Sequence, residues 1–412
     1  MSLSKELENR GFIHQCSAES LAEVLDGPKR TIYHGVDPSA DSIQAGNFAS
    51  WMLLSRLVKS GHKVILLIGG GTGMIGDPKP DVERPLTPPE VVAERVEKLR
   101  VQAKRLLGEE VIFVNNHDWL GSLKLIDFLR DIGKHFTVNE LIKKDAIATR
   151  LKSDNGISYT EFAYPLLQGY DFLELHRTYG CDVQVGGSDQ WGNIIAGVDL
   201  VRKKEQKTVY AITIPLIIDK TTGKKFGKSE GNSVWLDGEK TSPFAFYQFW
   251  LNVADENVVD YLKIYTFLSL EEIAVLEEEL KTNPGARKAQ RVLASKITAT
   301  VHGSETAKTV ANVSDVIFGS RTLHEMEKGE REILVRNAPT SKVTLGTSIV
   351  DVLVETGLAS SKREARTFVE SGAVSVNALK CIEASDVLEE RMFTDGLAVL
   401  RRGKKQVHIL EM

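Results

Sequence analysis

The sequence predicts an α/β fold: a doubly wound parallel sheet in the first half, then an all-α part and a small α+β part. Strand-like and helix-like segments alternate as far as Asn115, at 31–36, 46–61, 63–68, 89–107 and 111–115. Such βαβ order is typical of parallel sheets that bind ligands at the carboxyl ends of their strands. From about Lys240 onward, apolar residues recur at helical spacing instead.

The second half of the chain is predicted to be helical and then mixed. Helical periodicity covers 243–252, 255–265, 269–281 and 284–301. The polar segment 328–342 contains Pro339-Thr340-Ser341 and is typical of a linker. Two short helices, each followed by a glycine, and two strand-like segments come last, at 349–355, 361–370, 374–377 and 397–410. We therefore expect four parts: 1–238, 239–325, 326–344 and 345–412.

Composition describes an ordinary globular protein. The 412 residues are 42% hydrophobic and 26% charged, with a net charge of -4, so any RNA contact must rest on local basic clusters. The three cysteines are far apart and form no Cys-x-x-Cys pair, which argues against a zinc site or a disulfide framework. The apolar run 64–68 is far shorter than the roughly 20 residues of a membrane helix, and the N-terminus has no apolar signal segment. We expect a cytoplasmic protein without a metal site.

Three glycine-bearing loops are candidate ligand sites. Residues 71–76 satisfy the Gly-x-Gly-x-x-Gly string of NAD-binding proteins, but a run of prolines from Pro78 to Pro89 excludes the helix that this string must open. Residues 223–229 are one residue short of a Walker A motif, and a solvated basic turn is the alternative. Residues 185–193 combine glycines with Asp and Gln side chains, which suits either a ligand or a tight strand-to-helix turn.

Taken together, these loops resemble the class I aminoacyl-tRNA synthetases, and specifically the bacterial-type tyrosyl-tRNA synthetases. Residues 33–42 (YHGVDPSADS) are similar to the family's first strand, 186–193 to its Gly-Gly-Ser-Asp-Gln-Trp-Gly-Asn block, and 225–229 to its Lys-Met-Ser-Lys-Ser loop. The resemblance runs from about residue 10 to the C-terminus. It implies a Rossmann-like catalytic domain, a homodimer, and the substrates L-tyrosine, ATP with Mg²⁺, and tRNA(Tyr).

The resemblance also implies how tyrosine would be held. Tyr33 and Asp171 would face its hydroxyl, which can accept from a phenol and donate to a carboxylate. Asp77, Tyr164 and Gln168 would hold its ammonium group. Because Tyr164, Gln168 and Asp171 are spaced i, i+4 and i+7, one face of one helix can present all three.

Further positions are implied for the ATP end of the site. The matching residues are Ser39, Gln44, Asn47, Arg84, Lys225 and Lys228 for catalysis, Gln190 for tyrosine, and Gly35, Asp37, Gly46, Gly187, Asp189 and Lys228 for ATP and the adenylate. Attack of a carboxylate on the α-phosphate needs alignment and positive charge near the leaving group. Lys225, Lys228 and Arg84 would supply that charge at the pyrophosphate.

One signature departs from the family. Its His-Ile-Gly-His motif is Gln44-Ala45-Gly46-Asn47 here. A neutral amide can donate to a phosphate oxygen but carries no charge, and losing a charge-assisted hydrogen bond costs roughly 1 kcal/mol or more. We therefore predict slow adenylate formation. The alternatives are a synthetase-like RNA-binding protein that has lost activation, a tryptophan-activating enzyme, which the Tyr33 and Asp171 pair argues against, and an NAD-dependent oxidoreductase, which the proline run argues against.

The C-terminal part resembles a small RNA-binding domain first described in a ribosomal protein of the small subunit. Residues 341–412 hold as many Lys and Arg as Asp and Glu residues. The positive charges nevertheless cluster, on the second helix and around the Gly403 turn, at Lys362, Arg363, Arg366, Arg401, Arg402, Lys404 and Lys405. Such clusters suit contacts with tRNA phosphates, the alternative being a solvated helix face and a charged hairpin.

Overall fold

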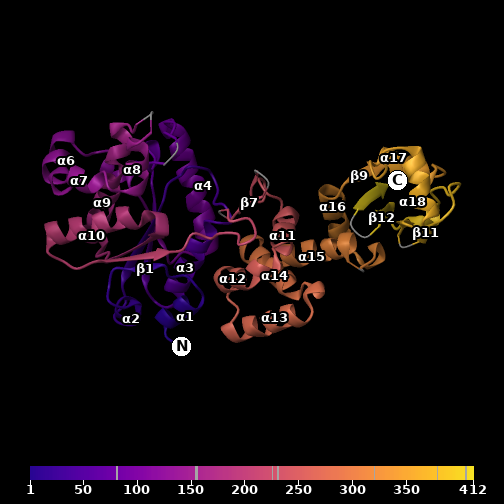
Figure 1. Cartoon of the computed structure of the whole chain (residues 1–412), viewed down its shortest axis with the longest axis horizontal. Helices are drawn as coiled ribbons and strands as arrows, with labels where there is room; N and C mark the ends of the chain where they lie inside the picture. Colours follow the sequence, from indigo (N-terminus) through magenta and orange to yellow (C-terminus); the bar gives the residue numbers. More distant parts are fainter. Residues whose placement is uncertain are drawn as a thin grey trace. The chain divides into compact units, whose positions relative to one another are not determined.

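The computed structural model describes residues 1–79, 82–153, 156–224, 226–229, 232–319, 321–377, 379–403 and 406–412. These residues form two compact units. The first contains 1–240 and 253–289, and the second contains 241–252 and 290–412. Figure 1 follows the chain through both units by colour, from the N-terminus to the C-terminus.

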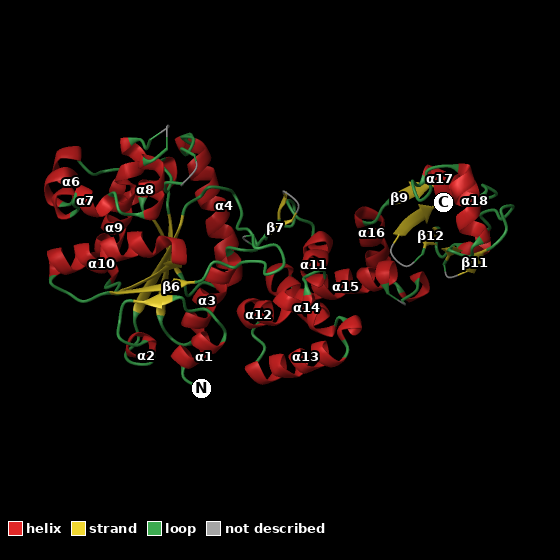
Figure 2. Ribbon diagram, viewed as in Figure 1, coloured by secondary structure: helices red, strands yellow, loops and turns green. Residues whose placement is uncertain are grey.

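The first unit is built on a six-stranded sheet in the order β1-β6-β5-β2-β3-β4 (Figure 2). Its strands are β1 (Gln15–Cys16), β2 (Thr31–Val36), β3 (Lys63–Ile68), β4 (Ile112–Asn115), β5 (Val183–Gly187) and β6 (Tyr210–Ile214). All neighbouring pairs are parallel except β1 with β6. The order reverses between β2 and β5, so the carboxyl ends of these two strands form the crevice where doubly wound sheets bind ligands.

Helices cover both faces of this sheet. The helices of this unit are α1 (Leu3–Asn9), α2 (Leu21–Leu25), α3 (Phe48–Lys59), α4 (Pro89–Leu107), α5 (His117–Leu120), α6 (Leu125–Asp131), α7 (Val138–Leu141), α8 (Asp145–Leu151), α9 (Tyr159–Tyr179), α10 (Trp191–Glu205), α12 (Asp255–Tyr265) and α13 (Leu270–Thr282). Ile65 and Leu67 pack in one core with Phe172 of α9 and Leu200 of α10. Because side chains alternate along a strand, Leu66 faces the opposite side, where α3 and α4 pack against β3.

The second unit joins helices to a smaller sheet. Its elements are α11 (Pro243–Leu251), α14 (Lys288–His302), α15 (Ser304–Phe318), α16 (Lys328–Asn337), β9 (Thr340–Lys342), α17 (Ile349–Glu355), α18 (Lys362–Glu370), β10 (Val374–Val376), β11 (Leu379–Cys381), β12 (Leu397–Arg402) and β13 (Gln406–Glu411). The strands lie in the order β11-β10-β12-β13-β9. Ile349, Leu353 and Val369 of α17 and α18 share a buried core with Leu400 of the sheet.

The predicted fold class is confirmed, and several predicted elements agree with the structure to the residue. The strands 31–36 and 63–68 and the helix 89–107 have the predicted bounds. Features that were not anticipated include the antiparallel edge strand β1 and the helix α16 inside the predicted linker. A capping box between Glu327 and Glu330 begins α16 and explains why this polar segment is helical.

The helices predicted for residues 239–325 are divided between the two units. Helices α12 and α13 belong to the first unit, where α12 packs against α3, while α11 and α15 belong to the second. The division of the chain at 238, 325 and 344 therefore remains a prediction. Within the described ranges, no helix is long and apolar enough to cross a membrane.

Candidate active site

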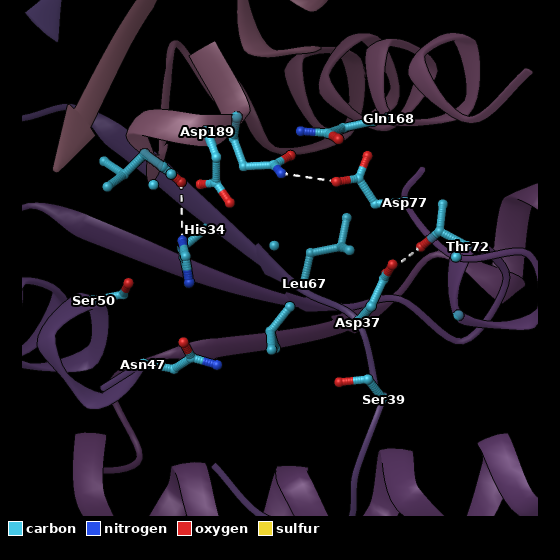
Figure 3. A pocket seen from close by; sticks show the side chains of 18 of the residues that line it. His34, Asp37, Ser39, Asn47, Ser50, Leu67, Thr72, Asp77, Gln168 and Asp189 are labelled. Carbon is cyan, nitrogen blue, oxygen red and sulfur yellow. Dashed lines mark hydrogen bonds between the residues drawn. The ribbon is translucent and has the colours of Figure 1, made fainter. Parts of the chain in front are cut away.

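A cavity of about 520 Å³ lies at the carboxyl ends of β2 and β5, where the strand order reverses (Figure 3). Side chains from the end of β2, the turn after β3, α9 and the turn after β5 converge on it. Most of the predicted site residues line it: Tyr33, Gly35, Asp37, Ser39, Gly46, Asn47, Asp77, Arg84, Tyr164, Gln168, Asp171, Gly187, Asp189 and Gln190. Residues far apart in the sequence thus share one cavity, of a size that suits a small organic ligand.

One part of this cavity holds a buried carboxyl group and a buried phenol. Asp171 is buried, and its two carboxylate oxygens accept from Asn116 Nδ2 at 2.9 Å and Trp119 Nε1 at 2.7 Å. Burial raises the pKa of Asp171 to about 7. The Tyr33 hydroxyl has no protein partner among the described residues, and its ring packs edge-on against Phe172. An orienting carboxyl group and an uncommitted phenol suit a ligand that carries a hydroxyl.

A second carboxylate, Asp37, is fixed just after β2. It accepts hydrogen bonds from Thr72 Oγ1 and from the Tyr164 hydroxyl, both at 2.8 Å. Burial raises the pKa of Asp37, and burial together with the nearby Asp37 charge raises the pKa of Tyr164 well above its ordinary value. Tyr164 is therefore a neutral donor, and one acceptor lone pair of its oxygen is left for the cavity.

The third carboxylate, Asp77, lies in the turn after β3. Gln190 Nε2 donates to one of its oxygens at 3.0 Å, and Asn193 Nδ2 donates to the other at 3.1 Å. Burial raises the pKa of Asp77 to about 6, and the neighbouring charges of Asp37 and Asp189 contribute to this rise. Asp77 is therefore a carboxylate at neutral pH. The Gln168 Oε1 atom is buried without a protein partner among the described residues. This corner collects acceptors and favours an ammonium group.

Arg84 brings positive charge to the same cavity. Its Nε donates to the Asp77 carbonyl at 2.9 Å, and its backbone N–H donates to Glu161 Oε1 at 2.7 Å. Glu161 is in turn paired with the buried Arg150 at 2.9 Å, and Arg150 also donates to the Lys79 carbonyl. The segment that carries Arg84 is thus fastened to α8 and α9 by a buried ion pair.

The two signature loops lie against each other. Gln44 forms an isolated antiparallel bridge with Trp235, and Ala45 N–H donates to the Val234 carbonyl at 2.8 Å. A Cβ atom at Gly46 would collide with the Phe226 carbonyl, so only glycine allows this approach. Asn47 lines the cavity and caps α3 without a side-chain bond, whereas Gln44 does not line it.

Some predicted residues cannot be placed. Lys225, Lys404 and Lys405 lie outside the described residues, as does the side chain of Lys228, whose backbone begins the short strand β7 (Lys228–Ser229), paired with β8 (Asn232–Ser233). Their predicted contacts with pyrophosphate and tRNA remain predictions. The first glycine loop, in contrast, is described, and the described residues between it and α4, which begins at Pro89, form no helix. This observation argues against a dinucleotide site.

Comparison with known proteins extends the likeness over the whole chain. The model described as tRNA synthetases class I (W and Y) matches residues 26–319, and that described as Tyrosine--tRNA ligase SYY-like C-terminal domain matches residues 330–410. The tyrosine–tRNA ligase of Chromobacterium violaceum is 44% identical, over 98% of this chain and 97% of its own length. That of Lactococcus lactis is 43% identical over 100% of both chains. The chain belongs to the class I tyrosyl-tRNA synthetase family.

A solved structure of this family agrees with the fold. The C-terminally truncated mitochondrial tyrosyl-tRNA synthetase of Aspergillus nidulans has a TM-score of 0.68 and 30% identity, covering 75% of this chain and 92% of that one. The Archaeoglobus fulgidus tyrosyl-tRNA synthetase complexed with L-tyrosine has a TM-score of 0.56 at 16% identity, with 74% and 99% covered, and shows the shared fold alone.

Four residues that hold the carboxylates of this cavity were not predicted from the sequence. Asn116 and Trp119 hold Asp171, Thr72 holds Asp37, and Asn193 holds Asp77. The sequence offered a signal for Asn116, because a polar residue directly after a strand lies at the ligand-binding edge of a parallel sheet. Asn193 was part of the recognised glycine block but had no assigned role.

In the C-terminal domain, the structure separates the predicted tRNA-binding residues into two groups. On α18, Arg363 and Arg366 are exposed, and Lys362 is paired with Asp351 at 2.7 Å. The β12 arginines have partners within the second unit. Arg401 donates to the carbonyls of Val316 and Ile317 at the end of α15. Arg402 donates to the Leu358 carbonyl and stacks over Phe368. Arg401 therefore fastens β12 to α15, and Arg402 fastens β12 to Leu358 and to α18.

Proposed function

We propose that this chain is a tyrosine–tRNA ligase, which activates L-tyrosine with ATP and then transfers it to tRNA(Tyr). The observation that carries the proposal is the pairing of Tyr33 and Asp171 in the cavity. Asn116 and Trp119 orient the Asp171 carboxyl group, and the Tyr33 hydroxyl has no competing protein partner. A phenolic substrate would contact both groups, whereas phenylalanine would leave the buried Tyr33 hydroxyl without a partner and offer Asp171 no donor.

The amino group of the substrate would lie at the acceptors of the same cavity. Asp77, Gln168 and Tyr164 offer a carboxylate, an amide oxygen and a phenol oxygen. Tyr164, Gln168 and Asp171 are spaced i, i+4 and i+7 on α9, so they lie along one face of this helix. A tyrosine molecule bridging Asp171 and Asp77 would thus be fixed at both ends, which prepares its carboxylate for reaction.

Activation is an in-line displacement at phosphorus. A carboxylate oxygen of tyrosine forms a bond to the α-phosphate, the bond from that phosphorus to the bridging oxygen breaks, and pyrophosphate leaves with the electron pair. Gly35 and Gly187 let ATP approach the backbone, while Asp37, Asp189 and Gln190 position the nucleoside and carboxylate. Arg84, Lys225 and Lys228, with Ser39, Gln44 and Asn47, would stabilise the phosphate charge.

We assign magnesium the role of an ATP companion. Among the residues that the structure describes, no group of three or more His, Cys, Asp or Glu side chains could hold a metal ion. When bound to ATP, magnesium neutralises phosphate charge. The chain's own side chains orient the two substrates.

Transfer to tRNA would use the C-terminal domain for positioning. In this step a hydroxyl oxygen at the 3′ end of the tRNA bonds to the tyrosyl carbonyl carbon and loses its proton to water, the bond from that carbon to the phosphate oxygen breaks, and AMP leaves with the electron pair. Lys362, Arg363 and Arg366 on α18 are exposed and suit phosphate contacts. The β12 arginines, together with Lys404 and Lys405, would extend this surface.

We also propose a homodimer in the cytoplasm. Apolar side chains on and near α6 and α7 are exposed on the chain and would be covered by a second copy: Leu125, Ile126, Leu129, Val138 and Ile142. The three cysteines are unpaired, which suits a reducing compartment. Sedimentation of wild-type and Ile126→Asp proteins tests the dimer: a monomeric wild type would contradict it.

Tyrosine-dependent exchange of pyrophosphate into ATP tests the activity. We expect exchange with tyrosine, and none with phenylalanine or tryptophan. Asp171→Ala should abolish selective exchange while leaving the fold intact. If the folded wild-type protein gives no exchange with any of the three but still binds tRNA, the proposed ligase is wrong and the inactive RNA-binding alternative holds.

A further inference from the structure

Asp77 lies between the cavity described above and a neighbouring one. The neighbouring cavity has a volume of about 590 Å³ and is lined by Asp77, Asn193, Lys143 and Lys144, among others. Gln190 lines only the first cavity, and Asn193 and Lys144 line only the second. Asn193 and Lys144 therefore do not line the cavity proposed for the substrate, and Asn193 contacts its lining at Asp77 and Gln190.

One ammonium group begins a directed chain of hydrogen bonds into this corner. Lys144, just before α8, donates to the Gly192 carbonyl at 2.5 Å and to Asn193 Oδ1 at 3.3 Å. Asn193 Nδ2 donates to Asp77 Oδ1 at 3.1 Å and to Gln190 Oε1 at 3.3 Å. Gln190 Nε2 donates to Asp77 Oδ2 at 3.0 Å. Both oxygens of Asp77 thus accept from side-chain amides, those of Asn193 and Gln190. Lys144 orients the Asn193 amide, and Asn193 orients the Gln190 amide.

The chain has a single possible direction. A lysine ammonium only donates, so the oxygen of the Asn193 amide must face Lys144 and its nitrogen must face Asp77. The same Asn193 nitrogen then requires the Gln190 oxygen, which turns the Gln190 nitrogen toward Asp77. Without Lys144, Asn193 could rotate its amide and place an oxygen against the Asp77 carboxylate, which would repel it.

The geometry points to Lys144 as a positioning residue for tyrosine binding: through Asn193 it fixes the orientation of Asp77 and Gln190 at the ammonium of the amino acid. This inference rests on the proposed function and deepens it. Lys144 would contact neither tyrosine nor ATP. Its loss should therefore weaken the binding of tyrosine and leave the binding of ATP unchanged.

The test is pyrophosphate exchange without tRNA, comparing Lys144→Met with the matched variant Lys143→Met, whose side chain is exposed and lines the same neighbouring cavity. We expect Lys144→Met to raise the KM for tyrosine about tenfold, the size of one hydrogen bond to a charged group. The KM for ATP should stay within about twofold of wild type, and Lys143→Met should match wild type.

A second set of variants separates positioning from a general packing role. Asn193→Ala should raise the KM for tyrosine as Lys144→Met does, and the double variant should be no worse than the worse single one, because both act on one chain of bonds. Lys144→Gln, which keeps a donor, should lie between Lys144→Met and wild type, and it serves as the test if Lys144→Met does not fold.

Three results would overturn the inference: an unchanged KM for tyrosine in Lys144→Met and Lys144→Gln, an equal rise in the KM for ATP, or fully additive effects with Asn193→Ala. If the wild-type protein shows tyrosine-dependent exchange, any of these results contradicts the proposed role of Lys144 but not the proposed ligase activity. If the wild-type protein shows no tyrosine-dependent exchange, both the proposed ligase activity and the proposed role of Lys144 are wrong.

Discussion

The buried ion pair between Arg150 and Glu161 supports the segment that carries Arg84, and its contribution to stability can be measured. Arg150 and Glu161 have side chains that are each only 2% exposed, and they meet at 2.9 Å. Replacing Glu161 with Gln keeps the shape but removes the negative charge, so the Arg150 guanidinium stays buried without a counter-charge. Breaking one partner of such a pair costs about 3–5 kcal/mol, a large share of the roughly 5–15 kcal/mol that stabilises a domain.

Urea unfolding of the full chain measures this cost. We expect Glu161→Gln to lower the free energy of unfolding by about 3–5 kcal/mol, and the double variant Arg150→Met with Glu161→Leu to recover most of it, since neither charge is then buried alone. Asp131→Asn is the control, because it removes a charge from a pair with Arg130 that is largely exposed. An unfolding midpoint for Glu161→Gln equal to that of the control would refute the reasoning.

Pyrophosphate exchange measures whether Glu161 also affects the active site through Arg84. Glu161 Oε1 accepts from the Arg84 backbone N–H, and a glutamine oxygen can still do so. Glu161→Gln should therefore keep a KM for ATP close to that of wild type once the protein is folded, whereas Glu161→Ala frees the Arg84 segment and should raise it several-fold. Equal values for the two variants would show that Arg84 does not depend on this contact.

Three further predictions concern specificity, pH and tRNA. Tyr33→Phe should reduce the preference for tyrosine over phenylalanine in exchange assays, with the KM for ATP unchanged; an unaltered preference would contradict the proposed hydroxyl contact. Because the pKa of Asp77 is raised to about 6 and that of Asp171 to about 7, both groups gain a proton as the pH falls from 7.5 to 5.5, and the KM for tyrosine should rise over this range; a flat profile would count against both contacts. Arg363→Glu with Arg366→Glu should weaken tRNA charging and leave exchange intact, and equal loss of both activities would refute a tRNA-positioning role.

The substitution of Gln44 stays an open prediction. Its side chain belongs to a segment that pairs with Trp235 and does not line the cavity, whereas Asn47 does. Gln44→His should speed tyrosine activation if the missing charge matters at the phosphates. An unchanged activation rate would show that the amide is a sufficient donor.

Local patterns determined a good part of this protein. The apolar strands 31–36 and 63–68 and the helix 89–107 could be bounded from sequence because periodicity, proline and glycine act within a few residues. The spacing of Tyr164, Gln168 and Asp171 also fixed their common helix face, since a helix repeats every 3.6 residues. The glycine blocks at 71–76 and 185–193, with their resemblance to the synthetases, predicted residues that line one cavity in the structure.

What the tertiary structure alone decided are the contacts between distant residues. Asn116 meets Asp171, Lys144 meets Asn193, and Arg401 meets the end of α15, each across a long stretch of chain. No local period encodes such pairs, because they depend on the order in which strands join the sheet and on how helices pack over it. Burial is likewise a property of the folded chain, and it is burial that raises the pKa of Asp171 to about 7 while the sequence shows only another aspartate.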